Sequence, residues 1–510
     1  MFLLSFRQIS DPDIWFYLVQ GREIVASSRI PLTEFYIFPA QGEPATFSAI
    51  GFGVLYFLVH QIGGFFAMAA FNAALATSAI FMLLMAAQNR EPASNRIETS
   101  IIVGLLVYLL AEFRFVYRPE NLLFVFLGTE IFILEAWLKD RISLRLLWLP
   151  PMVAVLSLFH TSAVLLLIVF ACYLAQYIFE LARNRHTSKA RELWFVLGIV
   201  LLLIAVPWLN PNGWEQFLVI LRSLINFNSD LVEYLPALKT EYRWHFIFTL
   251  ILAMAALFFA PVQRIADWLL IAAFAAVAWI YARNIGLFAM MIAVPLSRAL
   301  HHAVHRHGQF FTTFRLRWIA GILGIYALAG LIAAERWGYG VAAETVFSRA
   351  AVMIRQMSTG GNVMNFFHHG GYLAWELGPS YKVAVDGHFV RSSFASEYHD
   401  RVMRADNDWK SLLSRYDVKF ILTPATLPYS GEFVPLAQEL ARQDKWVLVN
   451  TEPAGLMFAR SDIAQSWRPI EKREIWMQAI RELDLLLDTY PQNHAARAAR
   501  AEAKRRSAEN

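Results

Sequence analysis

Cysteine and charged residues are scarce in this sequence. It contains one cysteine, Cys172, among 510 residues, and Asp, Glu, Lys and Arg make up 17% of the chain. A lone cysteine inside an apolar run excludes a disulfide framework and a cysteine-based metal cluster. We find no glycine-rich phosphate-binding loop, no Ser-His-Asp arrangement and no nucleic-acid-binding motif. The net charge of +5 comes from basic residues between apolar segments, which is typical of cytoplasmic loops rather than of nucleic-acid binding.

Apolar residues dominate instead. Hydrophobic residues make up 57% of the chain and aromatic residues 15%, which predicts an integral membrane protein. Apolar runs of about the length that crosses a bilayer indicate ten spans. They lie at about 65–87, 98–116, 119–138, 144–159, 161–182, 193–209, 244–260, 265–282, 284–305 and 316–334. Residues 1–9 are apolar but too short to cross, and we expect them to be the end of a truncated first span.

Basic residues set the orientation of these spans. Segments rich in lysine and arginine alternate with less basic ones, which places the basic segments in the cytoplasm. They are 88–97, 139–145, 183–191, 262–264 and 301–317. The same assignment places Arg118, residues 210–243, Arg283 and everything after Arg336 outside, and it requires residue 65 to start outside. We take residues 10–46 to be outside as well. Residues 47–64 then cannot cross, and we expect a juxtamembrane helix there.

From about Ala342 the composition is that of a soluble domain. Short β-like runs at 362–367, 382–385, 419–422 and 446–449 alternate with helical stretches at 395–415 and 433–443, which predicts a small α/β domain on the outer face. Residues 479–506 resemble one helix-turn-helix of a tetratricopeptide repeat, with Pro491 between the helices. We expect this tail to dock on the domain or on a protein partner; a frayed amphipathic tail is the alternative.

The predicted fold is mostly α: a polytopic helical membrane protein of 10–11 spans with a C-terminal extracytoplasmic α/β domain and a helical tail. The parts are the end of a truncated span, an outer loop with juxtamembrane helices, the transmembrane domain, the α/β domain and the tail. Their predicted bounds are 1–9, 10–64, 65–334, 335–462 and 463–510.

The stretch Ser10 to Ile24, SDPDIWFYLVQGREI, places two carboxylates directly before an aromatic amphipathic run. One interpretation is a helix start, with Asp11 as the N-cap, Pro12 at the first helical position and Asp13 in the first turn. The other is a catalytic base or metal ligand that faces water at a membrane surface. The local sequence leaves both open.

Polar residues from distant parts of the chain converge on the proposed outer face. They are Asp11, Asp13, Glu34, Arg118, Glu120, His160, the loop 209–217, Lys239, Arg243 and Arg283. Any single arginine at a span end can be a snorkelling anchor. Carboxylates opposite several cations, however, form a site that activates an acceptor hydroxyl while it holds an anionic phosphate leaving group.

The histidines are weaker signals. We expect His160, in the apolar stretch FHTSAV, to bond to a backbone carbonyl. His368 and His369 lack carboxylate or cysteine partners at metal-binding spacing. The glycine pairs in GGN (360–362) and HHGGYL (368–373) are typical of turns.

A series of motifs resembles a group of bacterial polytopic proteins that are similar to the GT-C superfamily of polyprenyl-phosphate-dependent glycosyltransferases. In chain order the motifs are DPDIWFYLVQGREI, RIPLTEFYIF, a segment ending in GG, RPENLLF, FHTS, LNPNGWE, RNIGLFAMMIAVPL, NFFHHGGYLAWEL and KVAVDGHF. The resemblance implies an active site between the first outer loop and later outer loops. It matches Asp11 and Asp13 to the acidic base or metal ligand, Arg118 to an Arg-Pro turn and Arg283 to the arginine that opens a late span. Five positions depart from the usual pattern: Phe16, Tyr17, Glu34, Leu158 and His388.

The resemblance implies a membrane glycosyltransferase at the outer face of the bacterial inner membrane. Its partners would be a lipid-linked sugar donor, membrane lipid and a glycan, lipid or protein acceptor, and its cofactor a divalent cation, Mg²⁺ or Mn²⁺, held by Asp11 or Asp13. The departures motivate the alternative, a non-catalytic membrane scaffold that recruits partners through its outer domain and tail. A transporter is disfavoured, because we see no ionisable residue at mid-span and no inverted repeat.

Overall fold

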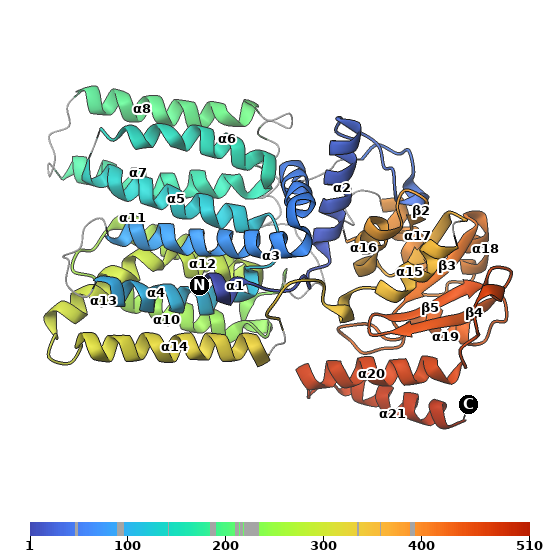
Figure 1. The fold of residues 1–510 in the computed structure, drawn as a ribbon. Helices are drawn as coiled ribbons and strands as arrows, with labels where there is room; N and C mark the ends of the chain where they lie inside the picture. The colour runs from blue at the N-terminus through green and yellow to red at the C-terminus, as the bar shows by residue number, and fades with distance from the viewer. Residues whose placement is uncertain are drawn as a thin grey trace. The chain divides into compact units, whose positions relative to one another are not determined.

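The computed structural model describes residues 1–45, 49–88, 96–140, 142–183, 190–209, 214, 218, 234–333, 336–357, 359–387 and 393–509. The chain forms two compact units (Figure 1). The first, here the membrane unit, comprises Met1–Gln8 and Ile62–Gly340. The second, here the α/β unit, comprises Ile9–Gln61 and Val341–Asn510. The acidic stretch therefore folds together with the C-terminal part of the chain.

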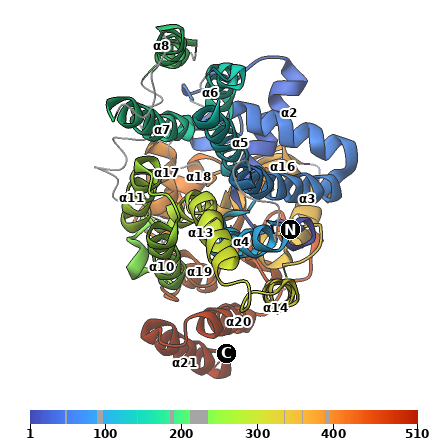
Figure 2. The same ribbon diagram turned by 90° about the vertical axis from the view of Figure 1, so that its left-hand side faces the viewer.

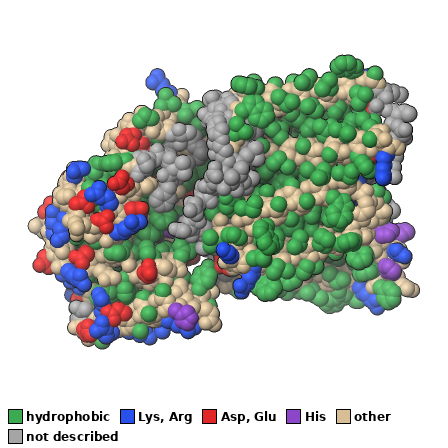
Figure 3. Space-filling view, turned by 180° about the vertical axis from the view of Figure 1, so that it is seen from behind, with side chains coloured by type: hydrophobic (Ala, Val, Ile, Leu, Met, Phe, Trp, Pro, Cys, Tyr) green, Lys and Arg blue, Asp and Glu red, His purple; other side chains and the backbone are tan. Residues whose placement is uncertain are grey.

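The membrane unit is helical. Its described helices are α1 (Phe2–Ser5), the later part of α3 (Ile50–Gln88), α4 (Arg96–Ala111), α5 (Glu120–Lys139), α6 (Leu149–Phe159), α7 (Val164–Ala182), α8 (Ala190–Ala205), α10 (Arg243–Phe259), α11 (Ile265–Ile280), α12 (Ile285–Met291), α13 (Ala293–Arg306) and α14 (Thr313–Ala333). Helices α8 and α14 lie at opposite edges of this bundle (Figure 2). Hydrophobic side chains cover most of its visible face in Figure 3, whereas charged side chains are scattered over the α/β unit.

All ten predicted spans coincide with helices of this unit. Among the described residues, five helices are long and apolar enough to cross a membrane: 50–88, 120–139, 161–182, 190–209 and 313–333. The predicted span 284–305 consists of two helices, because α12 and α13 meet at an angle of 46°. Pro295 explains the bend: it has no N–H for the carbonyl of Met291, and its ring clashes with that carbonyl in a continuous helix.

The expectation that no ionisable residue lies at mid-span is also wrong. Glu130 lies in the middle of α5 and is buried, and so is Glu135 one turn later. The Glu135 carboxylate binds the Arg264 guanidinium at 2.8 and 3.0 Å. Arg298 donates to Asp267 at 2.7 Å in a second buried pair. These pairs balance charge inside the bundle, where an unpaired ion is costly.

Helix α3 contains the predicted break at its glycine pair. Gly63 has φ −158° and ψ 26°, and Gly64 has φ 60° and ψ −148°, both outside the helical region. The positive φ of Gly64 favours glycine because a Cβ atom would be strained there. The segment before the pair and the span after it are therefore two helical pieces.

The α/β unit is built around a mixed sheet. In chain order its described elements are α2 (Asp13–Ser27), the first part of α3, α15 (Ser348–Gln356), β1 (Gly361–Asn365), α16 (Phe367–Leu377), β2 (Tyr381–Val383), α17 (Ser393–Met403), α18 (Trp409–Arg415), β3 (Val418–Thr423), α19 (Pro435–Ala441), β4 (Trp446–Glu452), β5 (Gly455–Arg460), α20 (Arg473–Thr489) and α21 (His494–Glu509). The strand order is β2-β1-β3-β5-β4. Strands β2, β1 and β3 are parallel, and β5 is antiparallel to both β3 and β4.

The direction of the chain across the sheet reverses at β1. The connection from β1 through α16 leads to β2, and the next connection passes back to β3 on the other side of β1. Right-handed crossovers therefore place α16 and the pair α17–α18 on opposite faces. Side chains from α17, α18, α19 and α20 share one core with Met364, Ile421 and Phe458 of the sheet.

Four local expectations for this unit can be compared with the structure. The predicted helix 395–415 is two helices, separated near Ala405, which has φ 54°. The HHGGYL motif lies in α16 and is not a turn. Gly360 and Gly361 have positive φ at the start of β1, a conformation that favours glycine. Strand β5 was not predicted, although its six-residue apolar run has the length of a strand.

The C-terminal tail docks on the α/β unit. Helices α20 and α21 contact each other, and α20 also contacts β4 and β5. Ile475, Ala479 and Ala503 from these two helices are buried in the core of the unit. The expectation that the tail docks on the domain is confirmed, and the alternative of a frayed tail is wrong.

Candidate functional site

The acidic stretch begins helix α2. The helix starts at Asp13, one residue later than predicted, with Pro12 immediately before it. The buried Asp11 carboxylate accepts the backbone N–H of Asp13 at 3.0 Å. Asp11 therefore satisfies a free donor at the helix start, as the first interpretation predicted.

Helix α2 packs closely on α16, although the two are far apart in the sequence. A Cβ atom on Gly371 would lie 2.9 Å from the backbone nitrogen of Phe16. Arg22 donates to the carbonyl oxygens of Trp375 at 2.7 Å and Ala374 at 3.0 Å, at the C-terminal end of α16. Gly371 thus permits close packing of the two helices, and Arg22 provides a donor for the Trp375 carbonyl near the helix end, while the Ala374 carbonyl also accepts the N–H of Gly378.

Asp13 faces the loop that follows β2. A Cβ atom on Gly387 would lie 2.9 Å from the Asp13 carboxylate oxygen Oδ1. The neighbouring Asp386 is fully buried and accepts a hydrogen bond from the hydroxyl of Tyr36. The structure therefore brings together the DPD motif, the VDG motif (385–387) and the aromatic loop around Tyr36. We refer to Asp13, Tyr36, Asp386 and Gly387 as the acidic cluster.

Glu34 has a structural position. It is buried, and its Oε1 accepts the backbone N–H groups of Phe35, Tyr36 and Ile37 at 3.0, 3.2 and 3.2 Å. Ile37 forms a parallel bridge with Val383 of β2. Glu34 therefore fixes the loop that carries Tyr36 to the edge of the sheet, a role that differs from the predicted substrate contact.

A second group of charged residues lies in the membrane unit. Glu120, the first residue of α5, has a buried carboxylate that binds Arg114 through Oε2 and Arg283 through Oε1, each at 2.5 Å. Arg283 lies in the short turn Ala282–Asn284 between α11 and α12, and it also donates to the hydroxyl of Tyr234. Gly286 leaves room for this arrangement, because its Cβ atom would lie 2.9 Å from Cγ of Arg114.

Arg118 and His160 complete this group, which we call the arginine cluster. Both interact electrostatically with Glu120. His160 lies at a helix break, and its Nδ1 accepts the backbone N–H of Ser162 at 2.9 Å. The expected bond to a backbone carbonyl is therefore wrong. In the neutral ring the proton is on Nε2, which is then a hydrogen-bond donor.

The local sequence explains how the RPEN motif positions Glu120. Pro119 directly precedes α5, and Glu120 lies in its first turn, where a carboxylate is favoured by the helix dipole. Asn121 is buried, and its amide donates to the carbonyl of Val116 at 2.6 Å, which closes the preceding turn. The turn thereby holds Arg118 next to Glu120.

The remaining predicted residues divide as follows. Lys239 and Arg243 are exposed on the segment after Tyr234, and Arg243 lies over the ring of Trp244 at 5.9 Å. Most of the loop 209–217 and His388 lie outside the described residues. Sequence analysis missed Arg114 and Tyr234 in the membrane unit and Tyr36 and Asp386 in the α/β unit. Two of the four, Tyr36 and Asp386, lie within motifs that it did single out.

The arginine cluster has the composition of an anion site. Its described members place three guanidinium groups and one imidazole around a single carboxylate. Guanidinium groups bind phosphate oxygens in a fixed two-pronged geometry. The cluster lies at the ends of the apolar helices α4, α5, α6 and α11.

A metal site is not assembled by side chains of the described residues. No group of three His, Cys, Asp or Glu side chains is placed to hold an ion there. Asp11 is engaged with the backbone of Asp13, which reduces its value as a ligand. The divalent cation implied by the resemblance stays a prediction.

Comparison with solved structures defines the class of fold. The chain has the fold of helical membrane oligosaccharyltransferases, which are of the GT-C type. The resemblance seen in the sequence is therefore confirmed for the fold. The archaeal oligosaccharyltransferase AglB from Archaeoglobus fulgidus, solved with an inhibitory peptide and a dolichol-phosphate, is 11% identical with a TM-score of 0.56. That match covers 92% of this chain and 74% of AglB.

The Archaeoglobus fulgidus oligosaccharyltransferase in its apo form is similar as well. It is 11% identical, with a TM-score of 0.55 over 89% of this chain and 71% of that chain. The sequence matches no protein-family model, and no curated protein matches it.

Proposed function

We propose that this protein transfers a sugar from a polyprenyl-phosphate-linked donor to an acceptor at the outer face of the bacterial inner membrane. The single observation that carries the proposal is the arginine cluster, in which Arg114, Arg118 and Arg283 surround Glu120 at the ends of apolar helices. AglB, which shares the fold, was solved with a dolichol-phosphate. That lipid is of the same chemical class as the proposed donor.

In this proposal Arg283 and Arg118 bind the phosphate of the donor and stabilise the charge that it gains as the leaving group. The Nε2–H of His160 donates a further hydrogen bond. Glu120 keeps the guanidinium groups in position, since its two carboxylate oxygens bind Arg114 and Arg283.

Asp13 deprotonates or orients the acceptor hydroxyl, and Asp11 holds Asp13 at the start of α2. The anomeric carbon develops positive charge as its bond to the phosphate oxygen breaks, and the acceptor oxygen forms the new bond. The proton of the acceptor passes to Asp13. A divalent cation, Mg²⁺ or Mn²⁺, would be held by Asp13 and would stabilise negative charge on the oxygen atoms that it binds.

The test is transfer from a synthetic polyprenyl-phosphate sugar by the purified protein in lipid nanodiscs. Arg283→Gln and Asp13→Asn should each lower kcat/KM about 100-fold or more, the range found when one electrostatic or acid–base group is removed. Arg183→Gln is a matched control. Arg183 is an arginine near an aromatic residue, with its guanidinium 4.7 Å from the ring of Phe179, but it belongs to neither cluster. Unchanged transfer in both Arg283→Gln and Asp13→Asn would refute the proposal.

The alternative function is a non-catalytic scaffold that recruits a protein partner through its outer domain and tail. One observation favours part of it: Asp11 acts as a helix cap. The tail, however, uses Ile475, Ala479 and Ala503 for the core of the α/β unit, so these side chains cannot also bind a partner. We therefore prefer the enzyme.

A further inference from the structure

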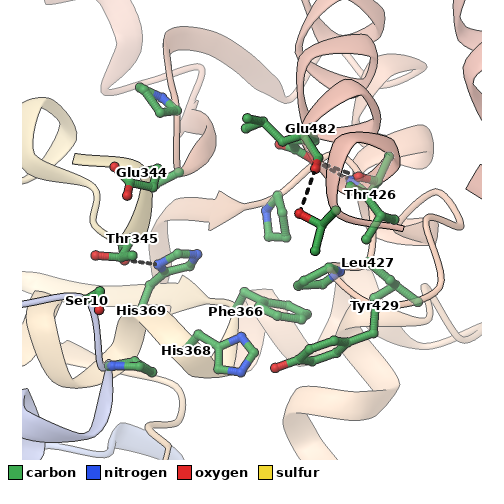
Figure 4. Close-up of a pocket in the computed structure, with 18 of the residues that line it drawn as sticks. Ser10, Glu344, Thr345, Phe366, His368, His369, Thr426, Leu427, Tyr429 and Glu482 are labelled. Atoms are coloured by element: carbon green, nitrogen blue, oxygen red, sulfur yellow. Dashed lines mark hydrogen bonds between the residues drawn. The ribbon is translucent and has the colours of Figure 1, made fainter. Parts of the chain in front are cut away.

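A cavity of about 430 Å³ lies within the α/β unit (Figure 4). It opens where β1 and β3 end: Phe366 follows β1, Pro424 follows β3, and both line it. The chain reverses its direction across the sheet at these strands, and ligands of open α/β sheets bind at the carboxyl ends of strands at such a switch point. The volume is within the range of about 300–1,000 Å³ typical of small-molecule sites.

The walls of the cavity are largely apolar and rigid. Four prolines contribute to them, from three separate loops: Pro12, Pro424, Pro428 and Pro453. Tyr429 lies at the rim and is 54% exposed, and its ring lies 6.3 Å from that of His368. Together they offer flat C–H and aromatic surfaces to a ligand.

The loop beneath Tyr429 is held in place by Glu482 of α20. Its two carboxylate oxygens accept the backbone N–H groups of Ala425 and Thr426 at 3.1 and 2.7 Å, and the hydroxyl of Thr426 at 2.9 Å (Figure 4). The cavity is therefore largely pre-formed, because these bonds fix the loop after β3 to the helical tail.

His369 provides a hydrogen-bond acceptor in the wall. Its Nδ1 lies 3.2 Å from the carbonyl oxygen of Thr345, which only accepts, so Nδ1 carries the proton and Nε2 has a lone pair (Figure 4). Burial lowers the pKa of His369 to about 4, so the ring is neutral at physiological pH. The described residues that line the cavity include no lysine or arginine, and an anionic group finds no counter-charge among them.

We propose that this cavity binds an uncharged saccharide, with its C–H face on Tyr429 and a hydroxyl donated to Nε2 of His369. A saccharide combines apolar faces with hydroxyl groups at its edges, which matches these walls. A peptide that binds by strand addition needs an open strand edge for its backbone, whereas this cavity opens at strand ends. That the bound saccharide is the acceptor of the transfer reaction rests on the proposed function. The proposal that the cavity binds a saccharide does not depend on that function.

Binding is tested by saturation-transfer NMR on the full chain in lipid nanodiscs, which avoid sugar-based detergents. The probes are mono-, di- and trisaccharides of glucose, mannose, galactose and N-acetylglucosamine. At least one should bind, and Tyr429→Ala should weaken it about tenfold. Phe394→Ala is the matched control, because Phe394 is an exposed aromatic residue of the same unit that does not line the cavity. Arg283→Gln should leave binding unchanged.

The outcomes separate the two proposals. Absence of binding by every probe, or binding that Tyr429→Ala leaves intact, would overturn the saccharide site. Binding of a proline-rich decapeptide that depends on Tyr429 would overturn it in favour of a peptide site. If saccharide binding is found but Arg283→Gln and Asp13→Asn both transfer normally, the proposed function fails while the saccharide site stands. If both hold, Tyr429→Ala should raise KM for the saccharide acceptor about tenfold with kcat unchanged.

Discussion

Replacing Arg22 by methionine should loosen helix α2 from α16. The side chain donates two charge-assisted hydrogen bonds, to the carbonyls of Trp375 at 2.7 Å and Ala374 at 3.0 Å, and its guanidinium lies 4.8 Å from the Trp375 ring. Each such hydrogen bond contributes about 1.5–3 kcal/mol, and the cation–π contact about 0.5–1 kcal/mol. Arg22 is only partly buried, so in the variant water replaces part of this stabilisation. We therefore expect the free energy of unfolding to fall by about 2–4 kcal/mol. Methionine preserves most of the apolar stem.

The assay is thermal unfolding followed by tryptophan fluorescence at one heating rate. A change of 1 kcal/mol shifts the Tm of a domain of this size class by about 2–4 °C, so the Tm of the α/β unit should fall by roughly 4–16 °C. Arg22→Lys should recover part of the loss, since lysine restores the charge but not the two-pronged geometry. Arg29→Met, at an exposed position just after α2, is the control. An unchanged Tm in Arg22→Met would refute the view that these contacts hold α2, and with it Asp13, in place.

Two further predictions concern the same unit. Burial lowers the pKa of His369 to about 4, below the ordinary value of about 6.5. The folded state therefore binds this proton less tightly than the unfolded state does. The contribution of neutral His369 to the free energy of unfolding is complete above about pH 6.5 and is lost as the pH falls toward 4. The loss amounts to up to about 3 kcal/mol. Unfolding at a series of pH values should show this slope, and His369→Gln should reduce it; an identical slope would contradict the assignment. Glu34→Ala should lower stability by about 2–4 kcal/mol, because the N–H groups of Phe35, Tyr36 and Ile37 lose their shared acceptor. A variant with normal stability but a raised substrate KM would instead restore the predicted substrate contact.

The sequence alone determined the main architecture. Apolar runs predict helices in a bilayer because a backbone in lipid must satisfy its hydrogen bonds within each segment. All ten predicted spans are helices, and the break at Gly63 and Gly64 was visible as a glycine pair. The alternation of basic segments predicted that Arg118, His160 and Arg283 share one side, and the structure brings them together around Glu120.

Other features were beyond the reach of local patterns. Helix α13 is bent from α12 by Pro295, which lies near the end of the apolar run 285–296. Strand β5 was missed because a short apolar run after a turn does not distinguish a strand from a loop. The buried Glu130 and Glu135 were overlooked because hydropathy averages over a window and hides single carboxylates.

Tertiary structure decided how the charged residues are used. Asp11 and Asp13 are equivalent in sequence, yet Asp11 bonds to the helix backbone while Asp13 faces Gly387. Arg114 became part of the arginine cluster only because α4 ends beside the start of α5 and the residue at position 286 is glycine. The cavity at the ends of β1 and β3 depends on contacts among three loops and α20. The physical reason is that hydropathy and charge act along the chain, whereas hydrogen-bond partners and cavities arise between residues that only the fold brings together.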